Sequence, residues 1–123
     1  MKKLFLGAAV LALALPGFTG RAVAQSVVDY PFLAECAAVF SAKAVETQGD
    51  IPPDYTENYY EVAAKFYQYA LRGGGDGMKA LYNDKLSEFK NTPNNDAVGK
   101  QYKRALEKQC RGIAPDFDIR FKR

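Results

Sequence analysis

The two residues with the clearest chemistry are Cys36 and Cys110, the only cysteines in the chain. A pair of cysteines can form a disulfide or contribute to a metal site. A structural zinc ion needs four nitrogen or sulfur ligands, and the chain has no histidine to complete such a set. In an oxidising compartment an even number of cysteines indicates disulfides, and two cysteines allow only one pairing. The sequence therefore predicts a Cys36–Cys110 disulfide, in preference to two free thiols, and no metal site.

Groups that could carry out catalysis are scarce. The absence of histidine excludes Ser-His-Asp and Cys-His arrangements, and the two cysteines do not form a C-x-x-C redox pair. Asp54, Glu57 and Glu61 would lie near one face of a helix and could act as an acid–base pair. However, Asp54 and Glu57 have the spacing of a capping box, which explains them without catalysis. We therefore expect no enzymatic activity, no catalytic residue and no cofactor.

The glycine-rich stretch 73–77 could be interpreted as a phosphate-binding loop, because such loops cradle anions at helix starts. It lacks the GxxxxGK[ST] spacing, and no predicted strand precedes it. We interpret it as a flexible linker in which Asp76 caps the next helix.

Tyrosine is the strongest remaining signal. Five of the eight tyrosines fall in segment 54–72, where apolar and aromatic residues cover more than half of the circumference of a predicted helix. Tyrosine joins an apolar ring to a polar hydroxyl, so it suits both the edge of a core and an interface. The candidate interaction face consists of Tyr55, Tyr59, Tyr60, Phe66, Tyr67 and Tyr69. Two interpretations stay open: core packing, or an exposed face that binds another protein of the cell envelope or exterior.

An alternative function is the transport of a small apolar or aromatic ligand held between the helices. It requires an enclosed cavity lined by residues such as Phe40, Phe66, Tyr69 and Phe89, whereas a solid core would exclude it. A contiguous exposed patch of aromatic residues, several hundred square ångströms in area, would instead favour protein binding.

The first residues have the order of a secretory signal peptide. Two lysines precede an apolar run, Leu4–Leu15, and Ala22-Val23-Ala24 is a cleavage site of small residues. The apolar run is shorter than the about 20 residues of a membrane-spanning helix. We therefore expect residues 1–24 to be cleaved and residues 25–123 to form a single helical domain without a stable membrane anchor. The mature protein would be periplasmic or secreted.

The charge of the chain gives no support to nucleic-acid binding. The full chain has a net charge of +3, but Lys2, Lys3 and Arg21 lie in the predicted signal peptide, so the mature chain is balanced. Its charges are nevertheless polarised, since segment 25–61 is mainly acidic and segment 100–123 is mainly basic. Either the two segments attract each other within the fold, or they form two functional patches of opposite sign.

Start and stop signals predict four helices, at about residues 30–48, 54–72, 77–90 and 96–112. From about residue 115, the alternation of Phe117, Ile119 and Phe121 with polar residues predicts a short extended tail that lies on the bundle.

The positions of the cysteines agree with a simple topology. In an up-down-up-down bundle, the start of the first helix and the end of the last helix lie at the same end as antiparallel neighbours. Cys36 and Cys110 occupy these two places. The predicted fold is therefore all-α, a small antiparallel four-helix bundle closed by one disulfide. This architecture is similar to that of the HdeA-type periplasmic acid chaperones, but the chain shares no motif with them, and we carry no functional residue across.

Overall fold

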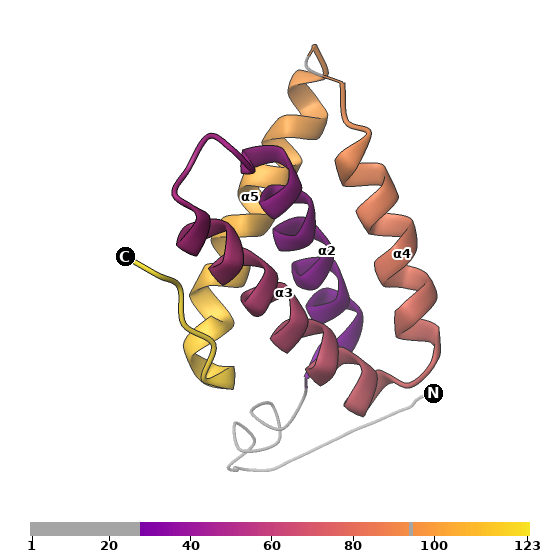
Figure 1. The fold of residues 1–123 in the computed structure, drawn as a ribbon. Helices are drawn as coiled ribbons and strands as arrows, with labels where there is room; N and C mark the ends of the chain where they lie inside the picture. The colour runs from indigo at the N-terminus through magenta and orange to yellow at the C-terminus, as the bar shows by residue number, and fades with distance from the viewer. Residues whose placement is uncertain (1–27, 94) are drawn as a thin grey trace, which may run out of the picture.

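The computed structural model describes residues 28–93 and 95–123, so the predicted signal peptide, residues 1–24, lies outside the described part. The described ranges form four α-helices and no β-strand: α2 (Tyr30–Thr47), α3 (Pro53–Gly74), α4 (Gly77–Lys90) and α5 (Ala97–Ile113). A 3-10 turn, η1 (Ala114–Phe117), follows α5. The expected all-helical fold is confirmed, and successive helices run in alternating directions (Figure 1). None of these described helices combines the length and apolar character needed to cross a bilayer.

Two helices begin where the sequence predicts. The Asp29 carboxylate accepts a hydrogen bond from the backbone N–H of Phe32 at 3.0 Å. Pro31 stands in the same first turn, where its missing N–H costs nothing. The Asp96 carboxylate caps α5 in the same way, accepting from the N–H of Gly99 at 2.9 Å. Both carboxylates therefore satisfy backbone donors that have no acceptor within the helix.

At the two other helix starts the capping differs from the prediction. α3 begins at Pro53, so Asp54 lies inside its first turn and does not cap it; the fixed φ of proline suits this first position. The Asp76 side chain precedes α4 but makes no capping hydrogen bond. α3 continues to Gly74, so only Gly75 and Asp76 separate it from α4. The linker is thus shorter than the glycine-rich stretch suggested.

α2 lies at the centre of the fold, and α3, α4 and α5 all pack against it (Figure 1). Ten of its 18 residues are buried. Small side chains make this arrangement possible, because the distance between two packed helices depends on the side chains at their contact. Its fully buried alanines are Ala34, Ala37, Ala38, Ala42 and Ala44. The four helices are therefore arranged as three around one.

Large side chains from every helix complete the core. The fully buried ones include Leu33, Val39 and Phe40 of α2, Val62 and Phe66 of α3, and Phe89 of α4. Beyond α5, the turn η1 stands where we expected the extended tail to begin, and the chain has no regular secondary structure from Asp118 onward. Ile119 anchors this last segment, since it is only 2% exposed.

Candidate interaction surface

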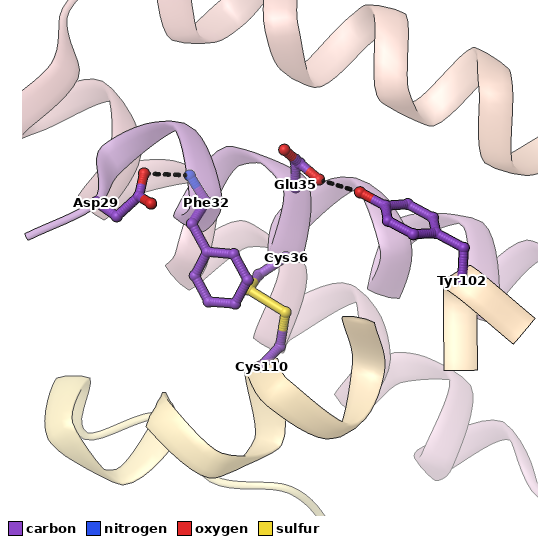
Figure 2. The surroundings of a disulfide bond; sticks show 6 residues. All are labelled: Asp29, Phe32, Glu35, Cys36, Tyr102 and Cys110. Atoms are coloured by element: carbon purple, nitrogen blue, oxygen red, sulfur yellow. Dashed lines mark hydrogen bonds between the residues drawn. A yellow bond between two sulfur atoms is a disulfide. The ribbon is translucent and has the colours of Figure 1, made fainter. Parts of the chain in front are cut away.

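The predicted disulfide is confirmed. Cys36 of α2 and Cys110 of α5 are joined, with a Cα–Cα distance of 5.7 Å, and both residues are fully buried. Figure 2 shows the bond crossing between the two helices, with the Asp29–Phe32 cap and Glu35 on the same helix as Cys36. The bond ties α5 to the central helix and closes a loop with a sequence separation of 74 residues.

The described part of the chain offers little reactive chemistry. It contains no free cysteine, and no group of three or more histidine, cysteine, aspartate or glutamate residues within it is placed to hold a metal ion.

The six residues of the candidate interaction face differ in how far they are buried. Phe66 is fully buried, so it is a core residue and not part of a surface. Tyr59 is half-buried, and its ring stacks on the ring of Phe40 with centroids 6.2 Å apart. These two residues support the core interpretation of the tyrosine-rich helix.

Tyr67 and Tyr69 are also half-buried and contact different neighbours. The Tyr67 ring lies 4.7 Å from the ring of Tyr82 on α4, and the Tyr82 hydroxyl is hydrogen-bonded to the hydroxyl of Ser41 on α2 at 2.9 Å. The Tyr69 ring lies 5.0 Å from the ring of Phe117 in η1. Both tyrosines therefore join α3 to other elements of the fold.

The residues that we expected to line a ligand cavity lie in the packed core or against it. Phe40, Phe66 and Phe89 are buried, and the rings of Phe40 and Phe66 lie 6.3 Å apart and nearly parallel. Tyr69 packs on Phe117. This packing lends the carrier hypothesis no support.

Tyr60 is the member of the candidate face that stays accessible, with 45% of its surface exposed. It lines a depression of about 450 Å³ at the junction of α2 and α3, together with Gln48, Gly49, Ile51, Pro53, Thr56 and Glu57. A second depression, of about 470 Å³, is lined by Asp54, Glu57, Asn58, Glu61 and Lys122. Because Glu57 lines both, the two depressions are neighbours. We name Ile51, Asp54, Glu57, Tyr60 and Glu61 the acidic–aromatic surface.

Tyr55 lies on the same turns of α3 but is half-buried. The ammonium group of Lys122 stands 5.9 Å from the centre of its ring, so the C-terminal segment covers this tyrosine in part.

Part of the charge polarity is neutralised within the fold. Lys103 of the basic segment pairs with Glu46 of the acidic segment, and Lys122 pairs with Asp54 at 3.3 Å. Attraction between the acidic and basic segments, one of the two interpretations of the sequence, is therefore present. The carboxylates of Glu57 and Glu61 take no share in it, since neither makes a hydrogen bond or ion pair with another described residue.

Lys103 is a buried cation that the sequence analysis did not single out. Its ammonium group donates to the backbone carbonyl of Phe89 at 3.0 Å and to the carboxylate of Glu46. A signal was present, because Lys103 lies three positions before Leu106 and seven before Cys110, which is the spacing of the buried face of a helix. The residue joins α2, α4 and α5, and its role is structural.

A second polar contact joins α5 to α2. The Tyr102 hydroxyl donates a hydrogen bond to the carboxylate of Glu35 at 2.7 Å (Figure 2). This hydrogen bond, followed by partial burial and the negative charge of Glu35, raises the pKa of Tyr102 to about 12. The phenol therefore stays protonated over the whole physiological range.

No protein family model, curated protein or solved structure matches this chain.

Proposed function

We propose that this chain is a small exported, non-enzymatic protein that acts by binding another protein through the acidic–aromatic surface. The observation that carries the proposal is Tyr60, which is 45% exposed and adjoins Glu57 in one depression. Tyrosine is favoured at the energetic centres of protein interfaces, because its rigid ring buries apolar area while its hydroxyl keeps a hydrogen bond.

The surface also suggests the chemistry of the partner. Glu57 and Glu61 have no cationic partner within the described residues, so a partner with arginine or lysine would supply one. An arginine could stack on the Tyr60 ring while its guanidinium pairs with Glu57. The apolar side chains of Ile51 and Pro53 in the same depression favour an apolar side chain between the partner's cations.

Export is part of the proposal. A buried disulfide that closes most of a small domain suits an oxidising compartment, where such bonds persist. The periplasm or the exterior is therefore the proposed location, in keeping with the signal peptide expected at residues 1–24, and the partner would be a protein of the envelope or the exterior.

The test is a pull-down from envelope extract. The bait is the oxidised domain, residues 25–123, used as the wild type and as two variants. Tyr60→Ala removes the exposed ring. Gln68→Ala is the matched control, because Gln68 is also an exposed residue of α3 but does not line either depression. We expect a protein that the wild type and Gln68→Ala capture equally and that Tyr60→Ala binds about 30-fold more weakly, the loss typical of an interface hot spot.

Thermal unfolding of all three proteins checks that Tyr60→Ala has not lost its fold. Equal capture by the two variants would remove the acidic–aromatic surface from consideration. If wild type captured no protein but retained a small molecule through purification, the carrier hypothesis would replace this one.

A further inference from the structure

The C-terminal segment is held along α3 by its backbone. The side-chain amide of Asn58 donates to the carbonyl oxygen of Arg120 at 3.2 Å, and its oxygen accepts from the N–H of Lys122 at 2.9 Å. Ile119, buried in the core, fixes the other end. Figure 1 shows the segment turning back from the end of α5 toward the first turns of α3. The side chains of this segment therefore project from a fixed backbone.

This segment and the end of α5 enclose a pocket of about 530 Å³ that is rich in cations. Four of the nine residues that line it are basic: Arg111, Arg120, Lys122 and Arg123. Asp118 is the acid among them, and its carboxylate accepts from Arg120 at 3.2 Å. Both side chains of that pair are more than 80% exposed, with values of 86% and 82%, so it is a weak ion pair in water.

Arg111 is oriented before any ligand arrives. Its guanidinium carbon lies 4.3 Å from the ring centre of Phe121 and 5.5 Å from that of Phe40. Stacking on aromatic rings leaves the edge of the guanidinium fork free to donate hydrogen bonds. The preceding residue, Cys110, is tied to α2 by the disulfide. Binding an anion would therefore cost this side chain little conformational entropy.

Two of the cationic side chains that line the pocket are available to bind an anion. The side chains of Arg111 and Arg123 make no hydrogen bond or ion pair with any described residue. Several cations close together repel one another, and a multivalent anion would relieve that repulsion. A carboxylate carries one negative charge, whereas a phosphate monoester carries about −1.5 to −2 at neutral pH and accepts the parallel hydrogen bonds of an arginine fork.

We infer that this pocket binds a phosphate-bearing ligand. Arg111 and Arg123 hold the phosphate, and Pro115 and Phe121 contact the body of the ligand. Arg120 and Lys122 are paired with Asp118 and Asp54 and are not needed to hold it. A volume of about 530 Å³ lies within the usual range of small-ligand sites, about 300–1,000 Å³, and exceeds what a phosphate group alone would fill. A soluble phosphate ester and the headgroup of a phospholipid share this chemistry.

The test is titration of the oxidised domain with inorganic pyrophosphate. Binding is measured by calorimetry and by the shifts of the amide NMR signals. We expect saturable binding of one equivalent, with the largest shifts at Arg111, Ile119 and Phe121. Arg111→Gln should weaken binding at least tenfold. The control is Arg104→Gln, which removes the same charge from an exposed position of the same helix outside the pocket, and it should change the affinity less than twofold.

Equal losses in these two variants, or no saturable binding to the wild type, would overturn the proposal, because only non-specific charge would then be at work. A further variant, Asn58→Ala, keeps all four cations but removes the two hydrogen bonds to the C-terminal segment. We expect about fivefold weaker binding from it, and an unchanged affinity would show that no preformed pocket exists.

A second experiment separates the two sources of phosphate. Glycerol phosphate is titrated as the soluble ester, and vesicles of phosphatidylcholine with and without phosphatidic acid are tested by co-sedimentation. Binding to either phosphate, sensitive to Arg111→Gln and insensitive to Arg104→Gln, supports the site and names its source. Failure of both overturns it. Neither result bears on the acidic–aromatic surface, which is tested by Tyr60→Ala.

Discussion

Two neighbouring helices, α2 and α3, occupy opposite kinds of environment. Ten of the 18 residues of α2 are buried, whereas only four of the 22 residues of α3 are: Val62, Ala63, Phe66 and Ala70. α3 has the greater aromatic content, yet its tyrosines are half-buried or exposed. Small side chains on a helix let neighbouring helices approach closely. In this domain, α2 therefore occupies the centre with three helices packed around it. The apolar fraction of a helix surface therefore does not by itself predict how deeply the helix is buried.

The largest expected effect concerns the bond that completes the packing around α2. Replacing both cysteines, as Cys36→Ser with Cys110→Ser, should lower the free energy of unfolding by about 3–4 kcal/mol, because the disulfide closes a loop with a sequence separation of 74 residues in the unfolded chain. Urea unfolding followed by circular dichroism measures the loss. Helicity in the absence of urea should be unchanged, and an unchanged urea midpoint would refute the stabilising role.

Enlarging one alanine in each helix tests whether α2 is more tightly packed than α3. Ala38 of α2 is fully buried, so Ala38→Leu forces extra atoms into a filled space and should cost about 1–3 kcal/mol. Ala64 of α3 is exposed, and Ala64→Leu should change stability by no more than about 0.5 kcal/mol. Thermal unfolding of the two variants measures both losses of stability. Similar losses in both would mean that α2 is not the more tightly enclosed helix.

The contact between the ends of the two helices predicts a smaller difference. A Cβ atom added at Gly73 would clash with ring atoms of Tyr30, whereas one added at Gly77 would meet nothing within 4 Å. Alanine is favoured over glycine in helices by about 1 kcal/mol, a gain available at Gly77 and offset at Gly73 by displacement of the Tyr30 ring. We expect Gly73→Ala to be less stable than Gly77→Ala by about 1–2 kcal/mol in chemical unfolding. Equal stability would show that the ring moves freely.

The smallest effect concerns the hydrogen bond from α5 to α2. The pKa of Tyr102 is raised from 10.0 to about 12, first by its hydrogen bond to Glu35. A raised pKa means that folding favours the protonated phenol, so this stabilisation is complete below pH 10 and is lost as the pH rises from 10 to 12. Because Tyr102 is 44% exposed, the contribution should stay below about 1 kcal/mol.

Titration of phenolate absorbance in the wild type and in Tyr102→Phe isolates this group. Glu35→Gln, which removes the charge but keeps an acceptor, should move the pKa of Tyr102 back toward its ordinary value. A Tyr102 that ionises near pH 10 in the wild type would contradict the assignment.

Local signals in the sequence were sufficient for some features of the fold and insufficient for others. Asp29 and Asp96 cap the helices that begin at the two predicted starts, because a cap involves only residues three positions apart. Asp54 has the spacing of a cap but lies within α3, since Pro53 begins that helix one residue earlier. The burial of Lys103 depends on a carbonyl of α4 and a carboxylate of α2, which no local pattern specifies.

The candidate surfaces follow the same division. The sequence pointed to the tyrosine-rich segment, and Tyr60 is its exposed member, but the burial of Phe66 is set by its neighbour Phe40 on another helix. The sequence analysis did not place the cationic pocket at the end of α5, because its C-terminal side is held by Asn58, more than 60 positions away in the chain. Only the polarity of charge along the chain hinted at it.

By itself, the sequence determined the all-helical character, the four helices of residues 28–93 and 95–123, and the disulfide. These follow from hydrophobic periodicity, helix-stopping residues and a single available cysteine pairing. Tertiary structure decided which helix lies at the centre, which tyrosines are covered and where the C-terminal segment lies. These outcomes depend on how side chains from distant segments fill a shared volume, and that volume exists only once the helices have packed.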